Sequence, residues 1–171
     1  MRQFWKWFGI ALLIGALVIA VGFLVPVFGT TAVRGVQTKN ISNAKQLALA
    51  VRIYAMDYEG RFPVHLSELV PDYIPGENLD DFLYAAKIGE EDKPRLKHDW
   101  LYFGAGFDAA NPPTVLIASP HAFRDGKKQK RIVVHPDGTG GVIDDEQYQA
   151  ELRKTIEAMH KRFDAAKTKP E

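Results

Sequence analysis

An uncharged apolar stretch near the amino terminus most constrains what this chain of 171 residues can fold into. Residues 8–29 contain no charged side chain and consist mostly of Ile, Leu, Val, Ala and Phe. As an α-helix they would rise about 33 Å, which is enough to cross the hydrocarbon core of a bilayer. Trp5 and Trp7 flank Lys6 just before this stretch, an arrangement typical of a membrane interface. The pattern predicts a short basic tail and a transmembrane anchor within residues 1–33.

A cleaved secretory signal is the alternative interpretation of residues 8–29. Such signals have an apolar core of roughly 7 to 15 residues, followed by a small-residue cleavage site. Thr30-Thr31-Ala32 is a weak match to that site, but the apolar stretch is longer than a signal requires. A retained anchor in the lipid bilayer is therefore the favoured prediction.

The bases on the two sides of the stretch bear on its orientation. Arg2 and Lys6 favour a cytoplasmic amino terminus, whereas Arg34, Lys39 and Lys45 favour the reverse. A short tail followed by one span most simply leaves the tail inside the cell. We therefore expect a single-pass protein with a cytoplasmic amino terminus and an extracytoplasmic domain.

Charge and cysteine content exclude several classes of protein. The first acidic residue is Asp57, so all 21 acids lie at or beyond that position and the rest of the chain is mildly acidic. This balance argues against a nucleic-acid-binding protein. The absence of cysteine excludes disulfides, thiolate catalysis and cysteine zinc sites.

Beyond the apolar stretch, the spacing of apolar residues predicts one amphipathic helix over 41–58. Gly60 can adopt the left-handed conformation that ends helices, and Pro63 prevents the helix from resuming. Phe62 is expected to turn into the core. The apolar stripe of the helix consists of Ile41, Ala44, Leu47, Ala48, Val51, Ala55 and Tyr58.

The residues after this helix predict a small antiparallel sheet. A short helix at 66–70 is expected to end at Pro71, and the charged region 76–99 has only one further helix-like pattern, at 79–86. Later runs have strand character and are separated by turns rich in Gly, Pro and Asp. These runs are 100–103, 114–119, 131–135 and 141–143, the last two joined by an Asp137-Gly138 turn.

The final segment, 144–171, predicts an amphipathic helix followed by a polar tail. Asp144 or Asp145 can cap this helix, with Gln147 as the capping-box partner of Asp144. Its apolar residues have the spacing of a core or lid rather than of a cofactor site; they are Tyr148, Leu152, Ile156, Met159 and Phe163. The predicted fold class is α+β: a transmembrane helix, an amphipathic helix packed on the antiparallel sheet of a domain over 34–143, and a C-terminal helix.

This order of elements is that of type IV pilins and of the pseudopilins of type II secretion. The stretch 43–63 ends in Y-A-M-D-Y-E-G-R-F-P and is followed by L-S-E-L-V-P-D-Y-I. It resembles the pseudopilin pattern of Tyr-x-x-Asp, then Gly-x-Phe/Tyr-Pro, then Leu-x-x-Leu-x-Pro-x-Tyr. The sequence I-V-V-H-P-D-G-T-G-G-V-I-D-D-E-Q-Y is similar to their final hairpin. The residues that carry the resemblance are Gly60, Phe62, Pro63, Leu66, Leu69, Pro71, Tyr73, Asp137 and Gly138.

The resemblance implies a structural or assembly component in protein transport, held at the bacterial inner membrane. Its implied partners are pseudopilin subunits or secretion-system membrane proteins. Gly9 and Ile10 are the possible processing site, because Lys6-Trp7-Phe8-Gly9 is similar to the end of a prepilin leader. The family carries a glutamate at the fifth mature position, where this chain has Ile14. A membrane segment without a carboxylate can remain a lone helix in lipid.

Two groups of residues are candidate metal ligands. His121, His135 and Asp137 approach one another if their strands pair, and such a group can bind a divalent metal. Asp137, Asp144 and Asp145 offer oxygens for calcium, which the major pseudopilins hold in a C-terminal loop, but the EF-hand spacing is absent. The alternative, a simple turn at 135–138 and a capped helix, is favoured, and no cofactor is predicted.

The densest basic cluster surrounds Asp125-Gly126 and consists of Arg124, Lys127, Lys128, Lys130 and Arg131. A hairpin of this composition is usually solvated, and the alternative is contact with anionic lipid headgroups or an acidic partner.

The chain is predicted not to be an enzyme. Ser119 and His121 are close in sequence but lack a Gly-x-Ser-x-Gly elbow, and no paired carboxylates lie in an apolar setting. The alternative to a pseudopilin-like role is a membrane-anchored ligand- or metal-binding module that is not incorporated into a filament. Its site would consist of His121, His135 and the acidic end of the final hairpin.

Overall fold

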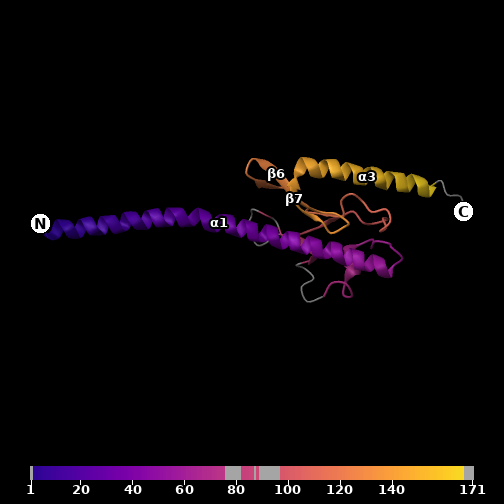
Figure 1. Ribbon diagram of the computed structural model, residues 1–171, viewed down its shortest axis with the longest axis horizontal. Helices are drawn as coiled ribbons and strands as arrows, with labels where there is room; N and C mark the ends of the chain where they lie inside the picture. Colours follow the sequence, from indigo (N-terminus) through magenta and orange to yellow (C-terminus); the bar gives the residue numbers. More distant parts are fainter. Residues whose placement is uncertain (1, 76–81, 87, 89–96, 168–171) are drawn as a thin grey trace. The chain divides into compact units, whose positions relative to one another are not determined.

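The computed structural model describes the backbone of residues 2–75, 82–86, 88 and 97–167. It divides into two compact units, Met1–Val36 and Gln37–Glu171. Helix α1, Arg2–Asp57, begins in the first unit and ends in the second (Figure 1). The two units are described separately below.

The first unit is helical over its described residues. Its described side chains include Leu13, Ile14 and Ile19, which are all exposed. Within the part of the chain that the structure describes, no helix has a stretch long and apolar enough to cross a membrane. Most side chains of the anchor predicted at 8–29, and those of Gly9 and Ile10, lie outside the described residues.

In the second unit, α1 is amphipathic as predicted. The apolar stripe from Ala44 to Ala55 is buried, and Ile41 packs at its edge. Tyr58 was expected in the core, but it lies just past the end of the helix and is 45% exposed. Its ring instead stacks on Tyr54.

The end of α1 is closed by two residues with positive φ. Gly60 has φ +85° as predicted, and Glu59 before it has φ +55°. The Gly60 N–H donates to the Ala55 carbonyl at 2.7 Å, the bond that closes a Schellman cap. The chain then turns back, because the Phe62 N–H donates to the Phe107 carbonyl at 3.1 Å.

The short helix predicted at 66–70 is a 3₁₀ helix, η1, Leu66–Leu69. Leu69 is fully buried, as are Phe62 and Pro63 just before the helix. Tyr73 and Ile74 donate their N–H groups to the Leu69 carbonyl, at 2.9 and 3.0 Å. The segment 60–74 therefore packs as one connector between α1 and the sheet.

Among its described residues, the second unit has two antiparallel sheets. Strands β1 (Tyr84–Ala86) and β2 (Lys97–Asp99) form a two-stranded sheet. The larger, five-stranded sheet has the order β3-β4-β6-β5, and β7 pairs with the other edge of β6. Its strands are β3 (Leu101–Tyr102), β4 (Ile117–Ala118), β5 (Phe123–Asp125), β6 (Lys128–Val134) and β7 (Gly140–Asp144).

The four predicted strands are confirmed in position, although β3 and β4 are shorter than expected. The helix predicted at 79–86 is wrong at 84–86, which form β1; residues 82 and 83 are helical, and 79–81 lie outside the described residues. This strand is held by tertiary contacts rather than by its own pattern. Asn40 of α1 receives the Ala86 N–H on its Oδ1 at 3.1 Å and donates from Nδ2 to the Ala86 carbonyl at 2.7 Å.

Strand β6 is covered on both faces, which Figure 1 shows as a sheet with α1 on one side and α3 on the other. Ile132 and Val134 belong to the core cluster formed with α1. Val133, between them, packs with Tyr148 of helix α3, Asp145–Lys167. The alternation follows from the pleat of a strand, and coverage of both faces explains why this strand reads as a continuous apolar run.

Helix α3 is confirmed, but its apolar stripe is only partly used. Tyr148 is 2% exposed, whereas Ile156 and Phe163 are 42% and 63% exposed. The predicted capping box is wrong because both side chains bond elsewhere. The Asp144 carboxylate pairs with Lys128, and the Gln147 amide donates to Glu151 Oε1 at 2.9 Å.

Replacing Phe62 tests the connector. Phe62→Ala is expected to lower the free energy of unfolding of the fragment 37–171 by about 3 to 5 kcal/mol, because it empties a buried aromatic site. Val64→Ala is the control: Val64 is two residues away and 57% exposed. Its effect should stay within about 0.5 kcal/mol. Equal urea midpoints for Phe62→Ala and the parent fragment would contradict this assignment.

Candidate functional site

The connector between α1 and the sheet gathers the residues of the pseudopilin-like motif. Tyr54 and Tyr58 stack with ring centroids 4.1 Å apart, and Tyr73 meets Tyr54 edge-on at 5.5 Å. We call these three residues the tyrosine cluster. The Tyr73 hydroxyl donates to Asp57 Oδ2 at 2.7 Å, and the Tyr54 hydroxyl donates to Glu68 Oε2 at 3.1 Å.

The predicted motif residues divide into buried and surface members. Phe62, Pro63 and Leu69 are buried, Leu66 and Tyr73 pack partly against the core, and Pro71 is exposed. Glu68 was not selected from the sequence, yet its carboxylate hydrogen-bonds to Tyr54 and to the backbone of the connector. Its Oε1 accepts the backbone N–H groups of Val64 and His65 at 3.1 and 2.9 Å.

Hydrogen bonding in the tyrosine cluster changes the acidity of its phenols. The hydrogen bond to Asp57, together with burial, raises the pKa of Tyr73 to about 12. Burial and the Glu68 carboxylate also raise the pKa of Tyr54. Tyr54 and Tyr73 are therefore both favoured in the neutral phenol form.

An open groove of about 570 Å³ lies beside the connector. Its lining is mostly apolar, with Met56, which is 76% exposed, among its residues. Arg52 and Asp137 are its charged members, and Arg52 Nη1 donates to the Asp137 backbone carbonyl at 3.0 Å. The lining residues are Arg52, Ala55, Met56, Gly60, Phe62, Ala109, Pro112, Pro136 and Asp137.

The turn between β6 and β7 forms a hydrogen-bonded chain at the edge of this groove. Asp137 Oδ1 accepts from the Thr139 hydroxyl at 2.6 Å and from its N–H at 2.8 Å. His135 Nε2 lies 3.0 Å from Glu151 Oε2 on α3, and His135 Nδ1 lies 3.5 Å from Thr139 Oγ1. The predicted Asp137-Gly138 turn is confirmed, with Gly138 at φ +84°.

The carboxylates of Asp137 and Glu151, which take part in these hydrogen bonds, are both favoured in the ionised form. The side-chain hydrogen bond from Thr139 is the main cause of the lowered pKa of Asp137. Burial acts to raise the pKa of Glu151, but hydrogen bonds from His135 and Gln147 outweigh it and lower the pKa.

The five candidate metal ligands are not brought together. His135 and Asp137 share one turn, whereas His121 lines a different cavity. Asp144 and Asp145 lie at the far end of β7, where they pair with Lys128 and Arg131. Among the described residues, no group of three or more His, Cys, Asp or Glu side chains is arranged to hold a metal ion.

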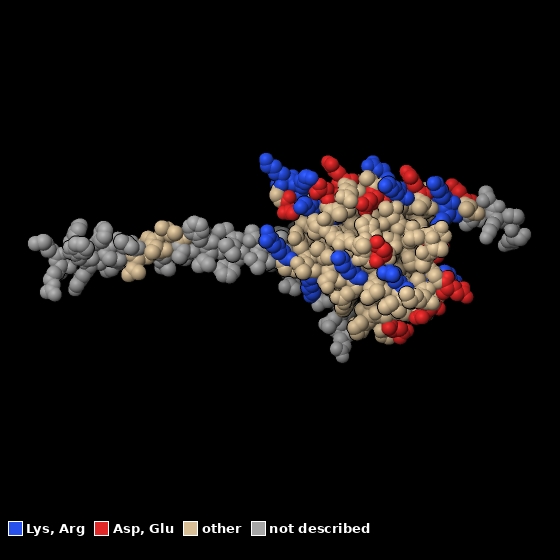
Figure 2. All heavy atoms as spheres, in the orientation of Figure 1, with Lys and Arg blue, Asp and Glu red and all other residues tan. Residues whose placement is uncertain are grey.

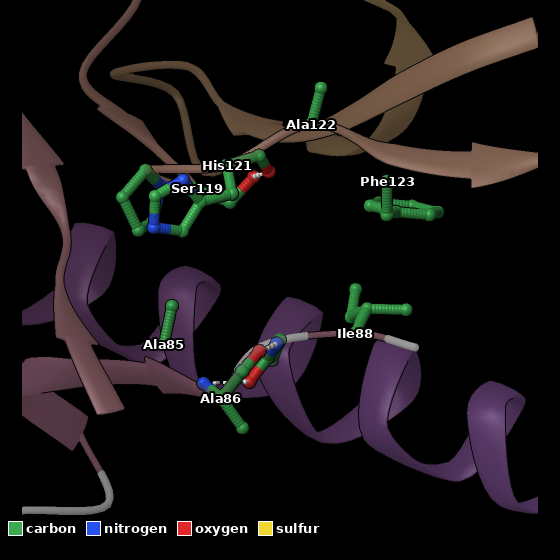
Figure 3. Close-up of a pocket in the computed structure, with 9 residues that line it drawn as sticks. Ala85, Ala86, Ile88, Ser119, His121, Ala122 and Phe123 are labelled. Atoms are coloured by element: carbon green, nitrogen blue, oxygen red, sulfur yellow. Dashed lines mark hydrogen bonds between the residues drawn. The ribbon is translucent and has the colours of Figure 1, made fainter. Parts of the chain in front are cut away.

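The cavity near His121 is small, about 20 Å³ (Figure 3). Ala85, Ala86 and Ile88 line one side, and Ser119, His121, Ala122 and Phe123 line the other. A space of this size holds about one water molecule. The Ser119 hydroxyl donates to the His121 carbonyl at 3.1 Å and accepts the Ile132 N–H at 3.2 Å. Its hydrogen bonds here are therefore to backbone groups.

Three bases of the predicted basic cluster form ion pairs. Lys128 pairs with Asp144, Lys130 with Asp125 at 2.7 Å, and Arg131 with Asp145 at 2.8 Å. Arg131 also lies over the Tyr148 ring, 4.5 Å from its centroid, and donates to the Ser119 and Pro120 carbonyls. Arg131 is therefore a structural residue that joins β6 to α3.

Two polar residues with structural roles were missed, although the sequence carried a signal for each. Asn40 lies at helical spacing from Ala44 and Leu47, and it is 2% exposed. Thr155 lies at helical spacing from Leu152 and Met159, and its Oγ1 accepts the Val115 N–H at 3.0 Å. A polar residue in register with an apolar stripe marks a buried hydrogen bond.

Comparison with family models, with curated proteins and with solved structures finds no match for this chain.

The Tyr73 hydrogen bond predicts a specific dependence of stability on alkaline pH. A phenol whose pKa is raised on folding stabilises the folded state at pH values below the unfolded pKa of about 10. That contribution is lost as the pH rises from about 10 to the folded value of about 12. The difference in unfolding free energy between the parent and Tyr73→Phe should therefore shrink over this range.

Urea unfolding of the two chains at each pH measures this difference, and the other ionisations largely cancel in it. The matched control repeats the pair in an Asp57→Asn background, where the difference should lose most of its pH dependence. A difference that stays constant up to pH of about 12 in the parent background would refute the assignment.

Proposed function

We propose that this chain is a membrane-anchored, pseudopilin-like structural or assembly component, related to type II secretion or type IV pilus systems. The observation that carries the proposal is the packing of residues 54–73, the end of α1 and most of the connector. There the Tyr-x-x-Asp, Gly-x-Phe-Pro and Leu-x-x-Leu-x-Pro-x-Tyr elements pack into one unit that joins α1 to an antiparallel sheet. In this proposal the chain works through interactions of its anchor and its domain surface and carries out no catalysis.

The membrane part of the proposal rests on the sequence. Residues 8–29 form a single-pass anchor in the bacterial inner membrane, with the amino terminus in the cytoplasm and the domain outside it. Because this segment contains no carboxylate, it is stable in lipid both as a lone helix and beside other subunits. Other pseudopilin subunits and secretion-system membrane proteins are the proposed partners.

The amino terminus of the membrane-extracted chain tests this proposal. The pseudopilin-like role predicts that the chain resists alkaline carbonate extraction and that its intact mass corresponds to a start at Ile10. A mass that begins at Met1 would instead favour a permanently anchored domain outside any filament. A chain shortened near Ala32 and recovered in the soluble fraction would contradict both, because the apolar stretch would then be a cleaved signal.

A second candidate function is a membrane-anchored ligand- or metal-binding module. The groove beside Arg52 and Asp137 favours it, since about 570 Å³ is within the range of small-molecule sites. The hydrogen-bonded residues His135, Thr139 and Glu151 supply polar groups close to the groove. In this candidate the protein acts alone rather than as a filament subunit.

Thermal unfolding of the full chain with calcium, zinc or a chelator tests the second candidate. A ligand that binds only the folded state at 100 times its Kd adds about 2.7 kcal/mol of stability. The module predicts such an increase for one of the ions, and a loss of that increase in Asp137→Asn. Ser67→Ala, exposed and outside the groove, is the control. Identical melting temperatures under all conditions would argue against a metal-binding role.

A further inference from the structure

Strand β6 and the part of α1 in the second unit run in the same direction. At one end, Asn40 of α1 lines the same small cavity as Phe123, which pairs with Lys130 of β6 (Figure 3). At the other end, Arg52 of α1 donates to the carbonyl of Asp137, just after β6. The turn between β5 and β6 therefore lies at the end of the unit where α1 enters it, as Figure 1 also shows.

Several charged residues of the second unit lie near one or the other of these two ends. At the end with the β5–β6 turn, bases outnumber acids among the described residues. The bases there are Lys39, Lys45, Arg124, Lys127, Lys128, Lys130 and Arg131, and the acids are Asp125, Asp144, Asp145 and Glu146. We call this region the basic end.

The opposite end carries the tyrosine cluster and the connector, and acids predominate there. They are Asp57, Glu59, Glu68, Asp72, Asp108 and Asp137, with Arg52, Arg61 and Arg162 as the nearby bases. Figure 2 shows blue side chains projecting at the upper left of the second unit and red ones at its lower right, with both colours mixed along its upper edge. Among the residues named above, the basic end therefore has an excess of positive charge and the opposite end an excess of negative charge.

Some bases of the basic end are in ion pairs, so the net positive charge of this end comes mainly from the others. Lys128, Lys130 and Arg131 are each matched by an acid of the same region, as described above. Arg124 and Lys127 are exposed on either side of Gly126, which has φ +63° at the tip of the turn. These two exposed bases lie beside the tip of the turn, so they add to the positive potential there.

We propose that the basic end docks on an anionic lipid surface and orients the second unit on the membrane. This inference rests on the proposed anchor at 8–29. Seven residues, 30–36, separate that segment from the second unit, and in the helical form of α1 they rise only about 10 Å. This length is close to the Debye length of about 8 Å at physiological ionic strength, so the surface potential of the bilayer reaches the unit.

Because residues 30–36 tether the second unit to the proposed anchor, a weak interaction is enough to hold the basic end at the lipid surface. Each base near an anionic surface contributes little alone, but a short linker raises the effective concentration of the surface to the millimolar range. The acidic end is repelled by the same surface, which adds to the orienting effect. The tyrosine cluster and the groove then face away from the lipid, where another subunit has access to them.

Fluorescence energy transfer from two single-cysteine variants of the full chain tests the inference. The natural sequence contains no cysteine, so a donor dye attached at Gln129→Cys reports only the basic end, and one at Ser67→Cys reports only the acidic end. Both positions are exposed. The labelled chains are reconstituted in nanodiscs of phosphatidylcholine alone or with phosphatidylglycerol, each with an acceptor dye on the headgroups.

The expected result is a higher transfer efficiency from position 129 in the anionic discs, and no such increase from position 67. The increase should disappear in about 0.5 M salt, because the Debye length then falls to only a few ångströms. Arg124→Gln with Lys127→Gln should lower the ratio of docked to undocked units roughly 30-fold, equivalent to about 1 kcal/mol per base.

A matched control removes the same charge elsewhere. Arg153→Gln with Lys161→Gln, two exposed bases of α3, should keep the lipid dependence. Equal transfer from position 129 in both lipids would overturn the inference, and so would an unchanged response in the Arg124 and Lys127 variant.

Carbonate extraction distinguishes a failure of the proposed anchor from a failure of the docking inference. A chain that the carbonate wash releases from the nanodisc lipids contradicts the proposed anchor. Docking of the basic end is then tested separately, by energy transfer from position 129 on vesicles of the same two lipid compositions. Transfer from position 129 that depends on anionic lipid still supports the basic end, and transfer independent of lipid overturns it.

Discussion

Burial of strand β6 on both faces is the constraint on which the rest of the second unit depends. Ile132 and Val134 meet α1, and Val133 meets Tyr148 of α3, so one strand joins the two helices through the sheet. Such coverage removes apolar area from water on both sides and accounts for the stability of a sheet with very short strands. The other elements are arranged around this strand, with β7 on one edge and β4 and β5 on the other.

Polar side chains hydrogen-bond to backbone groups that the apolar packing does not satisfy. Asn40 pairs both backbone groups of Ala86, Thr155 accepts the Val115 N–H, and Glu68 accepts two N–H groups at the start of η1. The bonds of Asn40 and Thr155 satisfy backbone groups that are partly or fully buried, where a lost partner is costly. Arg131 does the same for carbonyls beside α3. The unit therefore depends on a few long-range hydrogen bonds as well as on apolar burial.

The two ends of the unit suit different surroundings. The connector end combines an open groove, a cluster of phenols and a predominance of acids, and in the proposed function this is the surface that contacts another protein. The basic end combines an exposed turn with the entry of α1, which is the part of the unit tied to the predicted anchor. In the proposed function, orientation on the membrane and contact with other subunits are thus served by opposite ends of one small domain.

The sequence by itself determined the elements whose signals are local. The helical stripe from Ala44 to Ala55, the closure at Gly60, the turn at Asp137-Gly138 and the helix from Asp145 all follow from periodicity or turn chemistry within a few residues. Only the tertiary structure decided the features that depend on distant partners. Strand β1 pairs with β2, and Asn40 binds its Ala86 from 46 residues away, whereas no pattern in its own residues predicts a strand. The candidate metal ligands are separated for the same kind of reason: Asp144 ends β7 and Asp145 begins α3, one strand length from Asp137, and ion pairs with β6 hold them there. Pairing across the sheet fixes which side chains meet, and that pairing is not encoded in any short stretch of sequence.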